Sequence, residues 1–189
     1  MSSAAPGARG TPPVRPADVE AWLAELELTP LEHADRASIT SWDLSLDGRR
    51  RFDLRVTVIL DPSLGLFCWA HYAPPLMGVF RKSYRRLLRW NDEFPFAKFS
   101  VGDDERPVLA VEVPIEAVSR DALGLALARI VGIADTLLEE TTDWLWIGGK
   151  APDESGRVRR NEGLLERFAG DLPELLGEPD AAPVAGGTA

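Results

Sequence analysis

The side chains that most often hold metal ions are few in this sequence and lie far apart. Its only histidines are His33 and His71, and its only cysteine is Cys68. A zinc site needs three or four such ligands at a characteristic spacing, such as Cys-x-x-Cys, and no such spacing occurs. We therefore predict no metal site and no cofactor. A single cysteine also cannot form a disulfide within the chain.

Sequence motifs for catalysis are missing as well. No Gly-x-Ser-x-Gly nucleophile turn precedes a predicted helix. Gly102, Gly148 and Gly149 fit neither the phosphate-loop nor the dinucleotide-binding spacing. The acidic run at residues 132–143 is better explained by a solvated helix face than by paired catalytic carboxylates. We predict that the protein is not an enzyme and has no catalytic residues.

Charge is distributed unevenly along the chain. The net charge of −9 argues against nucleic acid as a partner, because phosphates repel an acidic surface. Residues 81–100 nevertheless carry six basic and two acidic side chains, a local net charge of +4. We treat the basic residues of the first part of this stretch as candidate partner-binding side chains: Arg81, Lys82, Arg85, Arg86 and Arg89.

The location of the protein is predicted from what the sequence lacks. No apolar run approaches the roughly 20 residues that a membrane span needs, so we expect no membrane partner. The first 16 residues contain no apolar signal region. Together with the single cysteine, these features favour the cytoplasm.

The basic residues belong to a predicted amphipathic helix over residues 80–94, followed by Pro95. The side chains expected on its apolar face are Phe80, Tyr84, Leu87, Leu88, Asn91 and Phe94. Asn91 has two interpretations, a ligand contact or an amide that satisfies backbone groups where the helix ends. The second is favoured, because helix ends leave carbonyl groups without partners.

Five strands are predicted from the alternation of apolar and polar residues, at 42–46, 52–60, 66–72, 98–101 and 109–113. Asp47-Gly48 is predicted to form a two-residue turn between the first two. The third strand is apolar on both faces, because Phe67 and Trp69 point away from Leu66, Cys68 and Ala70. Either helices cover both of its faces, or Phe67 and Trp69 meet a partner.

Two further helices complete the predicted order. One covers residues 17–29, and the other, about 25 residues long with Ser119 as its N-cap, ends at Gly148-Gly149. The order α-β-β-β-α-β-β-α predicts an α+β fold in which helices pack on one face of an antiparallel sheet. We expect a disordered tail at residues 1–16, a domain at 17–149 and a polar tail at 150–189. This last tail contains a weakly amphipathic helical segment at about 161–177.

This order resembles the YbjN-type domain, a family described as putative bacterial sensory transduction regulators. The residues that carry the resemblance are Leu87-Leu88-Arg89-Trp90-Asn91, Phe96-Ala97-Lys98-Phe99 and Ile133-Ala134-Asp135. The likeness covers roughly residues 17–146. It implies the fold of the type III secretion chaperones, which dimerise and hold segments of other proteins. The family pattern offers no catalytic residues.

Two functions from different classes remain open at this point. The first is a non-enzymatic adaptor or chaperone-like regulator that binds another protein or protein segment, with a homodimer as one form of that binding. The alternative is a small-molecule-binding or catalytic domain with a pocket between sheet and helices. A closed polar cavity would favour the alternative, and a filled core would favour the regulator.

The basic helix has three interpretations. Like charges four residues apart repel weakly, so something could offset them. The surface could simply be solvated, which we favour, since exposed charges contribute little. Otherwise the tail could dock its leucines and neutralise the arginines with its acids, or an acidic partner could do so.

Overall fold

The computed structural model describes residues 13–75, 80–146, 148–154 and 156–176, and the side chains of 80–82 are outside this description. The elements, in chain order, are α1 Pro16–Glu25, β1 Glu32–Arg36, β2 Ile39–Leu46, β3 Leu54–Asp61, β4 Gly65–His71, α2 Phe80–Glu93, β5 Lys98–Val101, β6 Pro107–Pro114, α3 Arg120–Thr136, α4 Leu138–Leu145, α5 Glu162–Phe168 and α6 Pro173–Leu176. Short 3₁₀ turns cover Ile115–Ala117 and Ala169–Asp171. Most of the predicted disordered stretch, residues 1–12, lies outside the described part.

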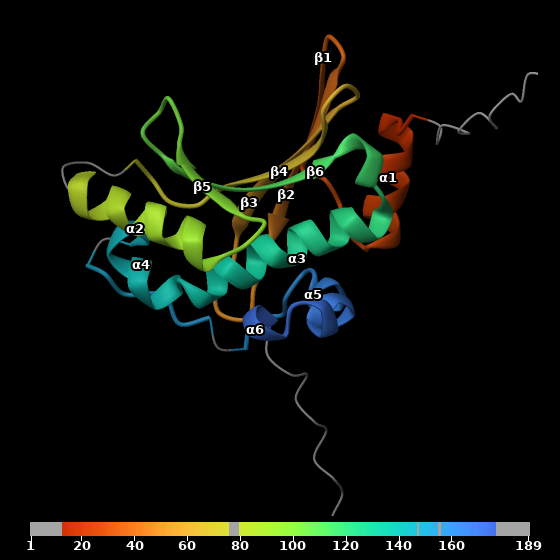
Figure 1. Cartoon of the computed structure of the whole chain (residues 1–189). Coiled ribbons are helices and arrows are strands. Elements are labelled where there is room, and N and C mark those ends of the chain that lie inside the picture. The colour runs from red at the N-terminus through yellow and green to blue at the C-terminus, as the bar shows by residue number, and fades with distance from the viewer. Residues whose placement is uncertain (1–12, 76–79, 147, 155, 177–189) are drawn as a thin grey trace, which may run out of the picture.

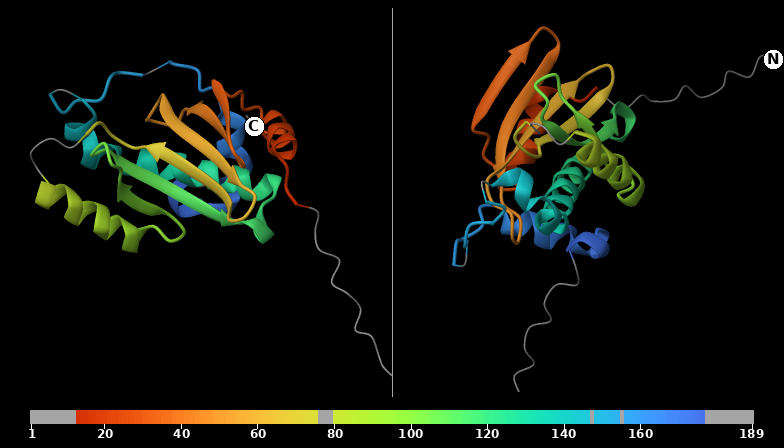
Figure 2. Two further views of the ribbon diagram at one scale, coloured as in Figure 1. Left: turned by 90° about the horizontal axis from the view of Figure 1, so that it is seen from above. Right: turned by 90° about the vertical axis from the view of Figure 1, so that its left-hand side faces the viewer.

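The strands form one antiparallel sheet in the order β1-β2-β3-β4-β6-β5. The helices collect on one side of this sheet, with α3 against it and α5 and α6 below α3 (Figure 1). Seen from above, α3 lies behind the central strands and no helix lies in front of them (Figure 2, left). The predicted α+β class and the placement of the helices on one face are confirmed.

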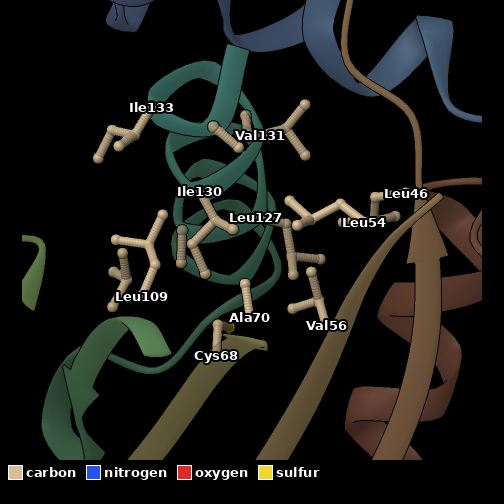
Figure 3. Packing of buried hydrophobic residues seen from close by; sticks show 14 of the residues in the cluster. Leu46, Leu54, Val56, Cys68, Ala70, Leu109, Leu127, Ile130, Val131 and Ile133 are labelled. Atoms are coloured by element: carbon tan, nitrogen blue, oxygen red, sulfur yellow. The ribbon is translucent and has the colours of Figure 1, made fainter. Parts of the chain in front are cut away.

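The core lies between the sheet and α3. Leu127 and Ile130 of α3 point toward Val56 of β3 and Leu109 of β6, and these side chains are buried (Figure 3). The predicted N-cap is confirmed, because the Ser119 hydroxyl accepts a hydrogen bond from the Ala122 amide at 3.2 Å. Alternation in β3 and β4 also places the expected residues inward.

α3 is buried on the side away from the sheet as well. Gly124 and Gly132 are eight residues apart and therefore share one helix face. A Cβ atom at Gly124 would collide with the ring of Phe168, and one at Gly132 would press on Leu175 and Leu176. The two glycines thus let α5 and α6 approach α3 closely. A helix covered on opposite sides needs apolar residues nearly all round, which α3 has.

β1 was absent from the prediction. All five of its residues are exposed, because it is the edge strand and pairs with β2 alone. A strand with no buried face has no alternation of apolar and polar residues, so its sequence gives no strand signal.

The predicted two-residue turn at Asp47-Gly48 is wrong. β2 ends at Leu46 and β3 begins at Leu54, so residues 47–53 form a longer loop. Asp47 is fully buried, and the carboxylate of Asp135 lies against Gly48. The conformation of this loop is therefore set by contacts with distant parts of the chain. The local turn preference of Asp47-Gly48 does not determine it.

The last predicted helix is in fact two helices. α3 ends at Thr136, Leu137 lies between the helices, and α4 ends at Leu145, before Gly148-Gly149. The hydroxyls of Thr136 and Thr141 donate to the carbonyls of Gly132 and Leu137 at 2.9 and 2.8 Å. Such bonds from threonine to the preceding turn bend helices.

The buried face of α2 is rotated by part of a turn from the predicted apolar face. Leu88 is 69% exposed, whereas Leu87 and Trp90 are buried. Trp90 packs against Phe99 of β5 and Trp144 of α4, with ring centroids 5.1 and 5.5 Å apart. The helix therefore turns a tryptophan inward that the predicted stripe had left out.

Candidate functional site

The surface best suited to binding is the side of the sheet opposite α3, called the open face below. Strand pairing aligns one row of side chains across it: Asp43, Thr57, Trp69, Ala110 and Lys98, from β2, β3, β4, β6 and β5. Trp69 belongs to a central strand and is 43% exposed. A large aromatic side chain exposed at the centre of a sheet makes this face a candidate interaction surface.

Apolar side chains surround Trp69 on the open face. Phe67 precedes it on β4, Ile59 is paired with Phe67 across β3, and Val108 belongs to β6. All three are half-buried, and Ala110, opposite Trp69, is buried. Of the predicted site residues, Phe67 and Trp69 therefore lie together, on a strand that helices cover on only one side (Figure 2, left).

Charged groups border this apolar centre on two sides. On one side the Asp43 carboxylate accepts a hydrogen bond from the Thr57 hydroxyl at 2.6 Å. On the other, the Lys98 ammonium pairs with Glu112, and both side chains are about half exposed. The open face thus has an apolar middle, with Asp43 of β2 on one side and the ion pair of Lys98 of β5 with Glu112 of β6 on the other.

The predicted basic residues occupy a different part of the molecule. α2 lies beside β5 on the helix side of the sheet (Figures 1 and 2). Arg85 is exposed, and Arg89 pairs with Glu93 at 3.0 Å. The side chains of Arg81 and Lys82 are outside the described residues. The structure therefore does not combine the α2 arginines with Phe67 and Trp69 in one site.

Arg86 is not on a free face of α2. Its guanidinium donates to the carbonyl of Glu140 at 2.8 Å and lies 5.8 Å from the ring centre of Trp144. It therefore helps to hold α2 against α4. No ion pair between the described side chains joins the acids of α5 and α6 to α2. Glu162 instead pairs with Arg159 at 2.8 Å.

Asn91 acts in a structural role. Its amide nitrogen donates to the carbonyl of Phe99 at 3.1 Å, and its amide oxygen accepts from the amide of the same residue. The expectation that Asn91 satisfies backbone groups is confirmed, although those groups belong to β5 and not to the end of the helix.

A buried polar network around the 47–53 loop was missed from the sequence. The Asp135 carboxylate, expected on a solvated helix face, is buried and accepts from the backbone amides of Arg49, Arg50 and Arg51. Two of these distances are 3.1 Å for Arg50 and 2.8 Å for Arg51. A carboxylate with three backbone donors fixes the path of the loop. In the sequence, the only sign that Asp135 has a special role is its place in the Ile133-Ala134-Asp135 motif.

Asp47 is the second centre of this network. Its carboxylate accepts from the Arg160 amide at 3.0 Å, from the Arg160 guanidinium and from the Asp53 amide. The Asn161 side chain pairs with both backbone groups of Asp47, at 2.6 and 2.8 Å. Burial opposes ionisation of Asp47, but the donors from Arg160 and Asp53 outweigh it and lower the pKa of Asp47 to about 2.

Arg51 is also buried and lies on the ring of Tyr72. Its guanidinium carbon is 4.5 Å from the ring centre, and it donates to the Tyr72 carbonyl. The Tyr72 hydroxyl bonds in turn to Thr141 at 2.9 Å. These contacts hold loop 47–53, β4 and α4 together, although the Nη1 atom of Arg51 is buried without a hydrogen-bond partner among the described residues.

Thiol chemistry is not supported by the surroundings of Cys68. The side chain is fully buried beneath α3, and burial raises the pKa of its thiol to about 12. Within residues 13–75, 80–146, 148–154 and 156–176, no three histidine, cysteine or acidic side chains are grouped as a metal site would require.

A hollow of about 610 Å³ opens between α1 and the β1–β2 hairpin. Trp42 lines it, and the His33 ring stacks on Trp42 with centroids 5.7 Å apart. Glu20 and Glu27 of the α1 region line it too. The hollow therefore lies at the rim of the sheet, whereas side chains fill the space between sheet and α3 (Figure 3).

No match was found among curated proteins. In the part of the chain that the structure describes, no helix combines the length and apolar character of a bilayer crossing. A family model matches residues 15–142, which include every strand, α1, α2 and α3, while α5 and α6 follow the matched region. The match covers more than half of the 189 residues, and the chain belongs to the YbjN family, "Putative bacterial sensory transduction regulator".

Proposed function

We propose that this protein is a non-enzymatic regulator that acts by binding another protein chain at the open face of its sheet. The observation that carries the proposal is the 43% exposure of Trp69 on a central strand. The half-buried Ile59, Phe67 and Val108 extend the apolar area around it. Burying about 100 Å² of apolar surface is worth roughly 2.5 kcal/mol, so such a patch favours association.

The chemistry of the remaining polar groups supports binding over catalysis. Asp47 and Asp135 are saturated with donors from the loop and from Arg160. Cys68 is buried, and its thiol is held neutral at physiological pH. Each of these three groups acts within the fold. The filled space between the sheet and α3 also favours a regulator over a protein with an internal small-molecule pocket.

Position-specific crosslinking tests the proposal. A photoreactive phenylalanine derivative replaces Trp69 in one variant and Leu88 in another, since Leu88 is an exposed apolar side chain on α2 at 69% exposure. The expected result in bacterial cells that express the protein is a covalent adduct with a protein chain from position 69 and none from position 88. Adducts of equal yield from both positions, or from 88 alone, would overturn the proposal.

A second measurement shows that the crosslinked surface matters for binding. Trp69→Glu and Leu88→Glu each place a charge at an exposed apolar position, so both variants should keep the melting temperature of the wild type within a few degrees. We expect Trp69→Glu to abolish capture of the adducted partner, and Leu88→Glu to leave it unchanged. Retained capture by a folded Trp69→Glu would contradict a binding role for the open face.

A further inference from the structure

The arrangement of charge on the open face points to one particular occupant. We propose that the face binds a second copy of this chain, related to the first by a two-fold axis that runs parallel to β4 and passes beside Trp69. This inference rests on the proposed function, because it names the partner that the open face would take.

The strand register supplies the first argument. Thr57 and Ala110 flank Trp69 on neighbouring strands, and Asp43 and Lys98 flank these in turn. Neighbouring strands are about 4.8 Å apart, so Asp43 and Lys98 both lie roughly 10 Å from Trp69, on opposite sides. Because Asp43 and Lys98 lie at equal distances on opposite sides of Trp69, a two-fold axis along β4 beside Trp69 places the Asp43 position of one copy opposite the Lys98 position of the other.

A two-fold axis along β4 therefore brings unlike charges together. It places Lys98 of the second copy over Asp43 of the first, and the same contact forms again with the copies exchanged. Thr57 meets Ala110, and Trp69 meets Trp69. If the axis is tilted by about 15° from β4, the two sheets are rotated by about 30° relative to each other, and groups 10 Å from the axis shift by roughly 5 Å, which a lysine side chain can span.

The groups opposite each other are available for these contacts. Asp43 uses one carboxylate oxygen to accept from Thr57 at 2.6 Å, which leaves its other oxygen for a second donor. Lys98 pairs with Glu112 of its own copy, and an ammonium group has three donors. Lys98 can therefore bind both carboxylates, and its charge stays at the polar rim of the contact.

The size of the face predicts the strength of the contact. Six strands present roughly 20 side chains on one face, at about 4.8 by 6.8 Å each, or roughly 650 Å² per copy. A standard stable interface buries about 800 Å² per partner. The dimer is therefore expected to be weak and to dissociate on dilution, with a dissociation constant in the micromolar range.

Charge reversal tests this arrangement, with molecular mass measured by sedimentation from about 5 to 500 µM. The wild type is expected to rise from the 20.7 kDa of one chain toward twice that mass. Asp43→Lys and Lys98→Asp each place like charges opposite one another twice, so each should weaken dimerisation at least tenfold. Asp92→Lys, an equal change on the exposed surface of α2, is the control and should dimerise as the wild type does.

An equimolar mixture of the two single variants is the decisive sample. In the mixed dimer, the lysine introduced at position 43 of one chain meets the aspartate introduced at position 98 of the other. The second contact joins the native Lys98 of the first chain to the native Asp43 of the second, so both contacts pair unlike charges again. Recovery of dimer mass in the mixture is therefore expected. A mixture that stays monomeric while the wild type dimerises would overturn the two-fold arrangement.

The outcomes separate this inference from the proposed function. If the wild type stays monomeric up to 500 µM while position 69 still crosslinks to a different protein, the second copy is ruled out and the binding role of the face stands. If position 69 gives no adduct at all and the wild type stays monomeric, both fail. Should Asp43→Lys not fold, Lys98→Asp alone must lose dimerisation, because it changes an exposed side chain.

Discussion

Arginines in two regions of this protein contribute in opposite ways. On α2, Arg85 and Arg89 are exposed, and Arg89 pairs with Glu93 one turn away. In the network around the 47–53 loop, Arg160 donates to Asp47, which is fully buried and lies more than a hundred residues away in sequence. The α2 cluster stands out in the sequence, yet the loop network is where charge is desolvated and paired.

The difference shows that burial and partner geometry decide how much a charged group contributes to stability. The number of charges nearby in the sequence does not decide it. Exposed ion pairs are worth at most about 1 kcal/mol, since water and salt screen them. Removing one partner from a buried pair costs about 3–5 kcal/mol, because the other charge is left without compensation. The following variants test this contrast, from the largest expected effect to the smallest.

Asp135→Ala should have the largest effect. It leaves the amides of Arg49, Arg50 and Arg51 without an acceptor inside the fold, and an unsatisfied donor costs about 1–3 kcal/mol where it is buried, as the Arg51 amide is. We expect a loss of about 3–5 kcal/mol in the free energy of unfolding, measured by urea titration. Asp143→Ala, an exposed acid on α4, is the matched control and should stay within about 0.5 kcal/mol. Equal effects of the two changes would mean that the network does not hold the loop.

Leu87→Ala and Leu88→Ala test what holds α2. Leu87 is buried and Leu88 is 69% exposed, so the first should cost about 2–5 kcal/mol and the second less than about 0.5. The same urea titration measures both. A larger loss for Leu88→Ala than for Leu87→Ala would support the apolar face predicted from periodicity. Similar losses would mean that α2 is loosely packed.

Asp47→Asn should reveal the pH dependence of the loop network. The pKa of Asp47 is lowered to about 2 in the folded protein, against an ordinary value near 4. The ionised carboxylate therefore stabilises the fold above pH 4 by about 2–3 kcal/mol, and this contribution is lost as the pH falls from about 4 to 2. The stability difference between wild type and Asp47→Asn should shrink over that range. A constant difference from pH 6 to pH 2.5 would contradict the assignment.

Arg89→Ala should have the smallest effect, about 0.5 kcal/mol or less, because its partner Glu93 is one helical turn away and both are exposed. Added salt should reduce even this difference. Thermal unfolding at low and high salt provides the measurement, and Arg160→Ala is the contrasting variant, with an expected cost several times larger. Comparable losses would remove the distinction between the two regions.

Sequence periodicity was sufficient where a feature depends on neighbours in the chain. The alternation in β3 and β4 and the N-cap at Ser119 follow from local geometry, and the structure has all three. The two-sided apolar character of β4 also singled out Phe67 and Trp69. Where the sequence misled, as with β1, the element had no buried face to leave a pattern.

The sequence by itself therefore determined the α+β class, the position of most elements and the aromatic side chains of the open face. Tertiary structure decided which side of α2 turns inward, because Leu87, Leu88 and Trp90 fit several stripes and only the packing against Phe99 and Trp144 selects one. It also decided that Asp135 is buried, because its backbone donors lie more than 80 residues away in the chain. Burial of a polar group depends on partners that are distant in sequence, and no local pattern records them.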